Sequence, residues 1–426
     1  GINAWHADAS AALVIDGKLI VAIEEERFTR RKHWAGFPAQ SIQFCLKEGG
    51  LNWSDIDFFA IGRDPKAKLA KKLLYLAQNP SGSLAAVRSR LDNQRKVRSV
   101  AEELGQVFET NPSSFKNKIK NVEHHRSHLA SAYFASPFDE AACLSIDGSG
   151  DFTTTMSAMA KGNKIEVLQS IDFPHSLGIF YSAFTQLLGF PHYGDEYKVM
   201  GMAPYGSPIY KDEISRLIHR QSDGTFRLDL SFFRKGTDGI ITYDEDFIPV
   251  VAPLYSPKMV AAFGPVREAN QPHTQKHKDM AASVQAVTEE TIFFLLNHLY
   301  DRTKCKNLCL AGGVAQNSVA NGKIKLHTPF EHVYIPSAGH DAGISMGAAL
   351  FTCFDQAPQT KRHFIRSAYL GSRFSNTEIK DYLDAIGLEY QKLDDDAVYD
   401  LVTQELINGG VVGWFTGRAE FGPRAL

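Results

Sequence analysis

The sequence predicts an α/β protein, and two observations carry that prediction. Apolar runs of strand length alternate along the chain with stretches whose apolar residues recur at helical spacing. Two of the expected strands, 141–146 and 307–311, run directly into glycine-containing turns, so we expect two similar halves. The 426 residues are 44% hydrophobic and 22% charged, which excludes a collagen-like, disordered or coiled-coil chain.

The first predicted elements are a hairpin, a helix and a strand. Apolar runs at 11–15 and 19–23 flank the dipeptide Asp16-Gly17, which is typical of a two-residue hairpin turn. Residues 41–50 have helical character, and residues 53–62 end in the apolar run of a strand. The alternation of an α/β protein therefore begins within the first 62 residues.

The later predicted elements continue this alternation. In chain order they are a basic helical stretch over 66–120, a strand at 141–146 with a hairpin partner at 153–160, a helix at 278–300, a strand at 307–311, a helix at 375–390 and a strand at 410–415. We interpret the basic residues of 66–120 as a solvated helix face, because they lack the interleaved aromatic residues of a nucleic-acid patch.

Charge and cysteine content exclude some partners and compartments. The chain has 46 Lys and Arg against 48 Asp and Glu, so any site for an anion must be local. No apolar run approaches the roughly 20 residues that cross a bilayer, and no signal peptide opens the chain. Its five cysteines are scattered in apolar runs. We therefore expect a cytoplasmic protein that binds neither nucleic acid nor membrane, and a homodimer is compatible with the sequence.

Two histidines and two aspartates form a candidate metal site. His124 and His128 are four residues apart, so on a helix both imidazoles lie on one face. Asp147 at the end of a strand and Asp341 in a glycine-containing loop are the best-placed oxygen ligands. Such a set suits a divalent iron, manganese or zinc ion, and spacing alone does not choose among them. The alternative is a pair of histidines that cap or pack a helix.

Two glycine turns are candidate phosphate sites. Gly148 and Gly150 follow a strand, and Gly312-Gly313 precede an expected helix, so backbone N–H groups there can approach phosphate oxygens. The alternative is a pair of structural turns. Neither turn matches the Walker or the dinucleotide-binding fingerprint, so a P-loop nucleotidase or a hydride-transfer enzyme is not supported.

Two arginines near the end of the sequence are candidate phosphate ligands. Arg418 and Arg424 lie next to glycines, and their planar guanidinium groups suit bidentate binding of a phosphate. The alternative role is a pair of surface salt bridges.

Several motifs, taken together and in chain order, resemble those of one enzyme family. They are Asp8-Ala9-Ser10-Ala11-Ala12, residues 24–30 with Lys32-His33 and 36–38, the His124/His128 segment, Asp147-Gly148, and residues 174–178, 196–206, 312–317 and 422–426. The sequence is similar to the NodU/CmcH-type O-carbamoyltransferases, which tailor antibiotics, nodulation factors and related natural products. This resemblance spans almost the whole chain.

The resemblance implies a fold and a domain order. The expected fold is the actin/sugar-kinase-like ATPase fold over 1–355, made of two ribonuclease-H-like halves at about 1–136 and 137–355. A linker at 356–365 and the N-terminal part of a YrdC-like α/β domain at 366–426 follow. Because that second domain is truncated here, we expect the chain to bind nucleotide and metal but not to form carbamoyl adenylate itself.

The resemblance also implies a reaction in two steps. A YrdC-like domain joins carbamoyl phosphate and ATP, with Mg²⁺, into carbamoyl adenylate. The ATPase-like domain then transfers the carbamoyl group to a hydroxyl of a small natural product and releases AMP. The implied partners are therefore carbamoyl phosphate, ATP and a small-molecule alcohol.

Site residues follow from the resemblance position by position. The implied metal ligands are His124, His128, Asp147 and Asp341, with Fe(II) as the expected ion and Mn or Zn as alternatives. The nucleotide-binding residues are Gly148, Ser149, Gly150, Lys198, Gly312, Gly313 and Asn317, and the residues for carbamoyl phosphate and ATP are Arg418 and Arg424. The catalytic residues are His6, Asp8, Lys32 and His33.

The catalytic base stays open between two histidines. Family members often place a histidine directly before the aspartate of the first motif, whereas Ala7 separates His6 from Asp8 here. His6 is the first choice and His33 the second for a group that accepts the proton of the acceptor hydroxyl.

Three other functions are compatible with parts of this pattern. A sugar or acetate kinase would share the glycine turns but would not need the histidine pair. A threonylcarbamoyl transferase of tRNA modification would share the chemistry but would act on RNA. A non-catalytic nucleotide-binding regulator would bind nucleotide without a metal.

Overall fold

The apolar runs near the start of the chain form the first sheet of the computed structural model, which describes residues 1–78, 100–234 and 241–423. Its strands are β1 (Ile2–Asn3), β2 (Ser10–Ile15), β3 (Lys18–Glu24), β4 (Phe59–Ile61) and β5 (Ile119–Asn121). Their order across the sheet is β3-β2-β1-β4-β5. Strands β1, β2 and β3 pair antiparallel, whereas β1, β4 and β5 pair parallel.

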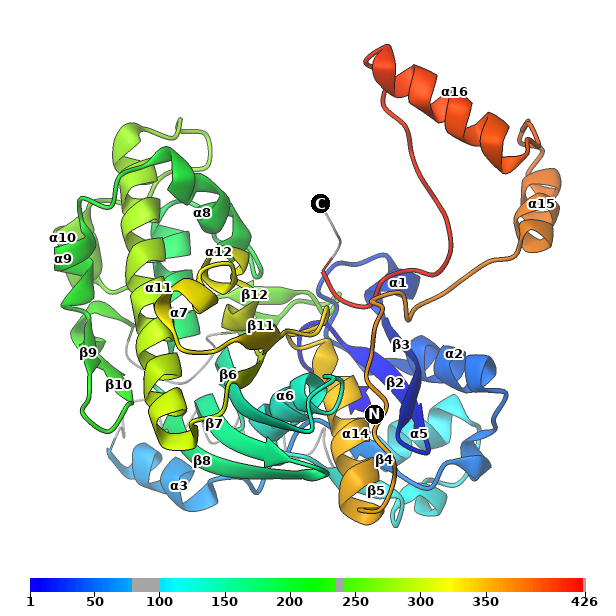
Figure 1. Cartoon of the computed structure of the whole chain (residues 1–426), viewed down its shortest axis with the longest axis horizontal. Coiled ribbons are helices and arrows are strands. Elements are labelled where there is room, and N and C mark those ends of the chain that lie inside the picture. The colour runs from blue at the N-terminus through cyan, green and yellow to red at the C-terminus, as the bar shows by residue number, and fades with distance from the viewer. Residues whose placement is uncertain (79–99, 235–240, 424–426) are drawn as a thin grey trace.

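A second five-stranded sheet repeats this pattern (Figure 1). Its strands are β6 (Glu140–Gly150), β7 (Thr153–Lys161), β8 (Lys164–Asp172), β13 (Asn307–Ala311) and β14 (His332–Tyr334). Their order is β8-β7-β6-β13-β14, with the first three antiparallel and β6, β13 and β14 parallel. Both sheets thus have the same strand order and directions, as expected for two similar halves.

Two helices pack between the sheets and cross from one half to the other. Helix α6 (His124–Tyr133) follows the first sheet in sequence but packs against β6, β7 and β13 of the second. Helix α14 (Gly343–Gln356) follows the second sheet but packs against β1, β2, β3 and β4 of the first. The two helices also contact each other, and their apolar residues join a core with β6, β7 and β13.

The outer faces of the sheets carry separate cores. On the first sheet, helices α2 (Ala39–Gly49) and α5 (Val100–Val107) contribute buried Ile42 and Leu104. On the second sheet, α7 (Leu177–Leu187) and the long α11 (Gln275–Thr303) form the largest apolar cluster. No helix among the described residues combines the length and the apolar character needed to cross a membrane.

The remaining elements are short or peripheral. They are α1 (Glu26–Thr29), η1 (Trp53–Asp55), α3 (Leu69–Gln78), η3 (Pro112–Phe115), α8 (Glu196–Met202), η4 (Ala203–Tyr205), α9 (Lys211–Ser215), β9 (Ile218–Arg220), β10 (Phe226–Leu228), η5 (Leu230–Phe232), β11 (Ile241–Tyr243), β12 (Pro249–Val251), α10 (Pro257–Phe263), η6 (Val314–Gln316), α12 (Ser318–Asn321), α13 (Ile324–His327), α15 (Asn376–Ala385) and α16 (Asp395–Ile407).

The structure corrects three sequence predictions. The strand predicted at 410–415 is wrong, because this segment has no regular structure and no strand of the described residues lies beside it. Helices α15 and α16 stand apart in Figure 1 and contain no buried residue. The tight turn predicted at 147–151 is wrong for its first four residues, since β6 continues to Gly150. The strand predicted over 53–62 is shorter, because η1 precedes β4. Part of the helical stretch predicted at 66–120, residues 79–99, lies outside the described residues.

The contact between α6 and α14 depends on Gly347. A Cβ atom at this position would lie 1.8 Å from the carbonyl oxygen of Ser127, so the two helix backbones approach too closely for any side chain. We predict that Gly347→Ala lowers the free energy of unfolding by about 1–3 kcal/mol or more, as overpacked helix contacts do. Denaturant titration of the purified chain measures the change.

Gly201→Ala is the matched control. Gly201 is also helical, but a Cβ atom there meets nothing within 4 Å. This substitution should leave the protein as stable or raise its stability by up to about 1 kcal/mol. If both variants unfold at the same denaturant concentration as the parent chain, the two helices are not in the close contact described.

Candidate functional site

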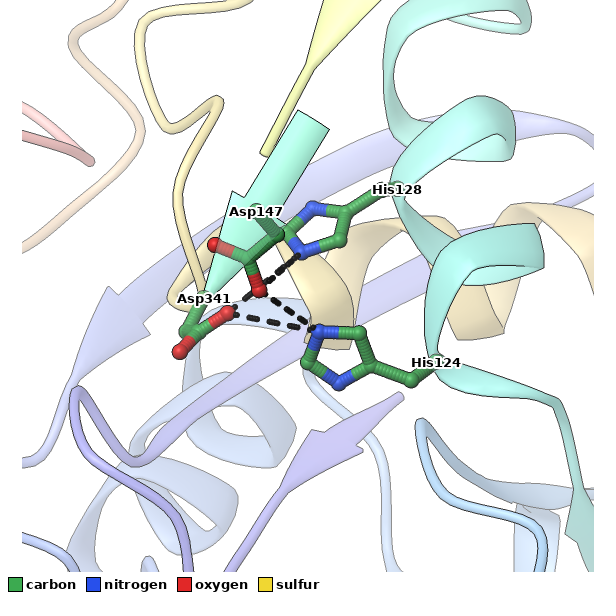
Figure 2. A group of neighbouring side chains, drawn as sticks. All are labelled: His124, His128, Asp147 and Asp341. Atoms are coloured by element: carbon green, nitrogen blue, oxygen red, sulfur yellow. Dashed lines mark hydrogen bonds and ion pairs between the residues drawn. The ribbon is translucent and has the colours of Figure 1, made fainter. Parts of the chain in front are cut away.

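Four buried side chains from three elements meet between the sheets (Figure 2). His124 and His128 lie one turn apart on α6, Asp147 lies near the end of β6, and Asp341 lies in the loop before α14. The Nε2 atom of His124 is 3.0 Å from Asp147 Oδ2 and 3.6 Å from Asp341 Oδ1. The Nε2 atom of His128 is 3.7 and 3.4 Å from the same two oxygens. We call these residues the four-ligand cluster.

The donor atoms of the four-ligand cluster suit a metal ion. One atom from each residue lies within 4.8 Å of all the others, and two imidazole nitrogens with two carboxylate oxygens are ligands that divalent transition metals accept. His128 Nε2 and Asp341 Oδ1 are buried, and in the described part of the chain neither has a hydrogen-bond partner with good geometry, although they lie 3.4 Å apart. Buried polar atoms are normally satisfied, so these two fit a ligand that binds between them.

Electrostatics keep both carboxylates ionised. Burial raises the pKa of Asp147, but His124 and His128 outweigh it and hold that pKa well below its usual value. Burial lowers the pKa of His128, and Asp147 and Asp341 raise it to about 9. The cluster therefore needs a positive charge, which a proton on an imidazole or a bound cation supplies.

Neighbouring groups orient the two aspartates. His6 Nδ1 lies 2.9 Å from Asp341 Oδ2, on the side of the carboxylate away from the histidine ligands. The backbone N–H of Gly313 donates to Asp147 Oδ1 over 2.9 Å. Gly312 makes this possible with a φ of 97°, and a Cβ atom there would lie 2.2 Å from the carbonyl oxygen of Ile146. The second glycine turn thus positions a ligand of the cluster.

A second group of polar side chains lies in the same region. His33 Nδ1 is 2.7 Å from Asp8 Oδ1, and the backbone N–H of His33 donates to Glu26 over 2.9 Å. Asp8 and His33 both have a φ of 59°, a left-handed conformation that concentrates at functional sites. Burial lowers the pKa of His33, but the Asp8 carboxylate outweighs it and raises that pKa above 6.5. We call these two residues the Asp8–His33 pair.

One large cavity of about 1510 Å³ joins the two groups. Its volume exceeds the roughly 300–1,000 Å³ of an ordinary small-molecule site. Sequence-predicted residues that line it are His6, Asp8, Lys32, His33, His124, Asp147, Gly148, Ser149, Gly150, Gly313, Asn317 and Asp341. Most of the predicted site residues thus line one cavity.

Several predicted site residues contact other groups of the protein. The side chain of Asn317 exchanges two hydrogen bonds of 2.9 Å with Gln285, and Lys198 Nζ forms an ion pair of 2.6 Å with Asp195. Arg418 donates to the carbonyl oxygen of Gly371 and to Glu48, at 2.8 and 3.2 Å. His128 and Gly312 are buried and do not line the cavity, and Arg424 lies outside the described residues.

Glu24, Tyr193 and Arg63 are among the cavity residues that were not predicted as site residues. Burial raises the pKa of Glu24 to about 8, so this carboxyl group is largely neutral near pH 7. The Tyr193 hydroxyl lies 3.4 Å from Asp341, and its ring packs edge-on against His33. Arg63 follows β4. Arg63 could have been predicted as a site residue from its position directly after a predicted strand. No feature of the sequence marks Tyr193 as a site residue.

Comparison with known proteins finds chains with similar sequences. An uncharacterized protein, sll1178, of Synechocystis sp. is 41% identical over 440 residues, which cover 100% of this chain and 69% of that protein. Nodulation protein NolNO of Sinorhizobium fredii is 34% identical over 432 residues, which cover 100% of this chain and 58% of that protein. The chain thus spans little more than half the length of the rhizobial relative.

A solved structure and a family model complete the comparison. Component A of (R)-2-hydroxyglutaryl-CoA dehydratase from Acidaminococcus fermentans has a TM-score of 0.42 and 13% identity, covering 84% of this chain and 98% of its own. At that TM-score the likeness carries no argument about ligands or activity. A family model described as Carbamoyltransferase N-terminus matches residues 1–350. This match, which includes all four residues of the four-ligand cluster and the Asp8–His33 pair, shows that the chain belongs to the carbamoyltransferase family.

Proposed function

We propose that this chain transfers the carbamoyl group of carbamoyl adenylate to a hydroxyl of a small molecule. The observation that carries the proposal is that the four-ligand cluster and the Asp8–His33 pair open into one cavity. Family membership supports carbamoyl transfer. The adenylate as donor, ATP as its source and a small natural product as acceptor are parts of the proposal.

The repeated sheets support the proposed fold. Two sheets of equal topology with a large cavity lined from both halves fit the actin/sugar-kinase-like ATPase fold with two ribonuclease-H-like halves. In this proposal residues 366–426 begin a YrdC-like domain that forms the adenylate. The experiment below supplies carbamoyl adenylate directly, so that it tests the transfer step alone.

The four-ligand cluster would hold a divalent metal ion, with Fe(II) proposed and Mn or Zn as alternatives. His124, His128, Asp147 and Asp341 supply the ligands, while His6 and the Gly313 N–H hold the two carboxylates in place. A bound metal ion supplies Lewis-acid stabilisation for a phosphoryl leaving group.

The Asp8–His33 pair is the better candidate for the base. Both imidazoles use Nδ1 for a carboxylate and leave Nε2, but the partner of His6 is Asp341, a residue of the four-ligand cluster, whereas the partner of His33 is Asp8, which lies outside that cluster. Gly194 keeps Nε2 of His33 accessible, since a Cβ atom there would lie 2.7 Å from this nitrogen. The proposed base therefore changes from His6 to His33.

In the proposed step, the acceptor hydroxyl loses its proton and the carbamoyl carbon exchanges its bond to phosphate for a bond to the acceptor oxygen. The acceptor oxygen attacks the carbamoyl carbon while His33 Nε2 takes the hydroxyl proton, and Asp8 stabilises the imidazolium that forms. The bond from the carbamoyl carbon to the phosphate oxygen then breaks, and AMP leaves with the electron pair. Lys32 also lines this part of the cavity and adds positive charge.

Transfer from synthetic carbamoyl adenylate tests the proposed function. The metal-loaded chain, incubated with a panel of alcohols, should release AMP in an acceptor-dependent manner and form a carbamate ester, detected by mass spectrometry. Transfer of the γ-phosphate of ATP to a sugar would favour a kinase. Modification of RNA alone would favour a tRNA-modifying transferase, and nucleotide binding without a metal or turnover would favour a regulator.

The metal site is tested by elemental analysis and metal titration. His124→Ala should abolish stoichiometric binding, because one of four ligands is lost. His6→Ala should weaken metal affinity by about 10- to 100-fold, as loss of a group that orients a ligand does. The exposed His332→Ala is the control and should bind as the parent chain does. Unchanged affinity in His6→Ala with complete loss of transfer would identify His6 as the base instead.

The Asp8–His33 pair predicts a particular pH dependence. His33 must be unprotonated to act, so the rate rises with pH through its raised pKa. Asp8→Asn removes the carboxylate that raises this pKa, so the acid limb of the kcat/KM profile should move to lower pH. His33→Ala should slow transfer by about 100- to 10,000-fold.

Asp246→Asn is the control for that pH profile. Asp246 is exposed and paired with Arg31, so its substitution should leave the acid limb in place. An acid limb that also stays in place in Asp8→Asn would contradict the role of the Asp8–His33 pair.

A further inference from the structure

Arg63 places a positive charge in the cavity wall without a negative partner. Its Nη1 atom is buried and has no hydrogen-bond partner. No ion pair joins Arg63 to a carboxylate within residues 1–78, 100–234 and 241–423. The residue as a whole is half-buried, but because guanidinium groups stay charged in proteins, a buried guanidinium nitrogen without a partner is unfavourable.

The backbone around Arg63 is fixed relative to the four-ligand cluster. Gly62 donates to the carbonyl oxygen of Ile2 over 3.1 Å, and the Arg63 carbonyl oxygen accepts from Asn121 over 2.8 Å. Asp151 Oδ2 accepts the backbone N–H of both Asp64 and His124, at 2.7 and 3.0 Å. One carboxylate thus ties the loop after β4 to the start of the helix that carries the histidine ligands.

The ionisable groups near Arg63 do not neutralise it. Burial lowers the pKa of His6, Asp341 raises it, and Arg63 opposes that rise. Burial raises the pKa of Tyr243 to about 12 although Arg63 lowers it, so this phenol is neutral at pH 7. Asp147 and Asp341 already contact the imidazoles of the cluster and His6. The guanidinium is therefore available to a ligand.

We propose that Arg63 binds an oxyanion of the ligand in this cavity, beside the four-ligand cluster. The inference rests on the proposed function for the identity of that ligand. Arg63 lines the same cavity as His124, Asp147 and Asp341, which favours the phosphoryl group of the carbamoyl donor over a carboxylate or phosphate of the acceptor. Arg63 is then a specificity residue for an anionic ligand.

Arg63 would also favour the bond-breaking step. When the bond from the carbamoyl carbon to the phosphate oxygen breaks, the phosphate of AMP gains a second negative charge. A guanidinium held in place before the reaction interacts more strongly with that charge than with the donor, and such preorganised contacts lower the barrier.

Binding of AMP and of adenosine to the metal-loaded chain separates the phosphoryl contact from the rest of the nucleotide. Isothermal titration should show that Arg63→Met weakens AMP binding by about 10- to 100-fold, as loss of a charged hydrogen bond does, and leaves adenosine binding unchanged. Arg63→Lys should retain part of the AMP affinity, because lysine keeps the positive charge but lacks the planar guanidinium group that binds two oxygens at once. Arg227→Gln, at the exposed central residue of β10, is the matched control.

Two further measurements make the test decisive. Thermal unfolding checks that Arg63→Met folds, which we expect because the side chain is half-buried and donates no hydrogen bond from its buried Nη1 that the substitution would remove. Glucuronate and glucose serve as carboxylate-bearing and neutral probes of an acceptor. Loss of glucuronate binding alone would support the oxyanion site and assign it to the acceptor. Unchanged binding of AMP, inorganic phosphate and glucuronate in folded Arg63→Met would overturn the inference.

These outcomes are independent of the transfer assay. If carbamoyl transfer fails but Arg63→Met still loses AMP affinity, the oxyanion site stands and the proposed function falls. If transfer occurs and AMP affinity is unchanged in Arg63→Met, the proposed function stands and the role of Arg63 as a phosphoryl ligand falls.

Discussion

The structure depends on the burial of two carboxylates, Asp147 and Asp341, between two sheets. An ionised carboxylate is costly to bury unless positive charge and hydrogen bonds compensate it, and here the compensation comes from distant parts of the chain. His124 and His128 approach on α6, His6 approaches from the loop after β1, and the Gly313 N–H approaches from the loop after β13. The two sheets must therefore meet at one place for the site to exist.

The crossed packing of α6 and α14 determines that meeting place. Helix α6 packs on the second sheet, so both histidines are held against β6, the strand that carries Asp147. Three of the four ligands thus belong to one packed unit. Asp341 contacts His6 of the first half as well as the histidine ligands. Asp341 is therefore the residue of the four-ligand cluster that contacts the first half of the structure.

Local sequence patterns predicted the parts of this site that depend on local geometry. The spacing of His124 and His128 predicts a shared helix face, and the strand before Asp147 predicts its position, because both follow from backbone periodicity. Asp341 lies 194 positions beyond Asp147 in the numbering, and the sequence analysis selected it as an oxygen ligand without evidence from spacing. Which partner an isolated loop histidine finds is a tertiary property, so the contact of His6 with Asp341 could not be predicted.

The wrong predictions have a related cause. Residues 410–415 have the composition of a strand, but a strand forms only where another strand accepts its hydrogen bonds, and none lies beside this segment among the described residues. The phosphate role predicted for Arg418 and the nucleotide role that the family resemblance implies for Asn317 stay predictions. In the structure both side chains bond protein groups, Gly371 and Glu48 for Arg418 and Gln285 for Asn317. Residue type defines what a side chain is able to bind, whereas its neighbours decide what it binds.

The two halves also divide the proposed chemistry. The four-ligand cluster is held mainly against the second sheet, whereas the Asp8–His33 pair and Arg63 lie in loops of the first sheet. A small shift of one half against the other would change the distance from the base to the cluster while leaving His124, His128 and Asp147 together. The His6–Asp341 contact, at 2.9 Å, opposes such a shift. His6 would then contribute to transfer without touching the acceptor, by keeping the proposed base, the oxyanion site and the metal ligands at a constant separation.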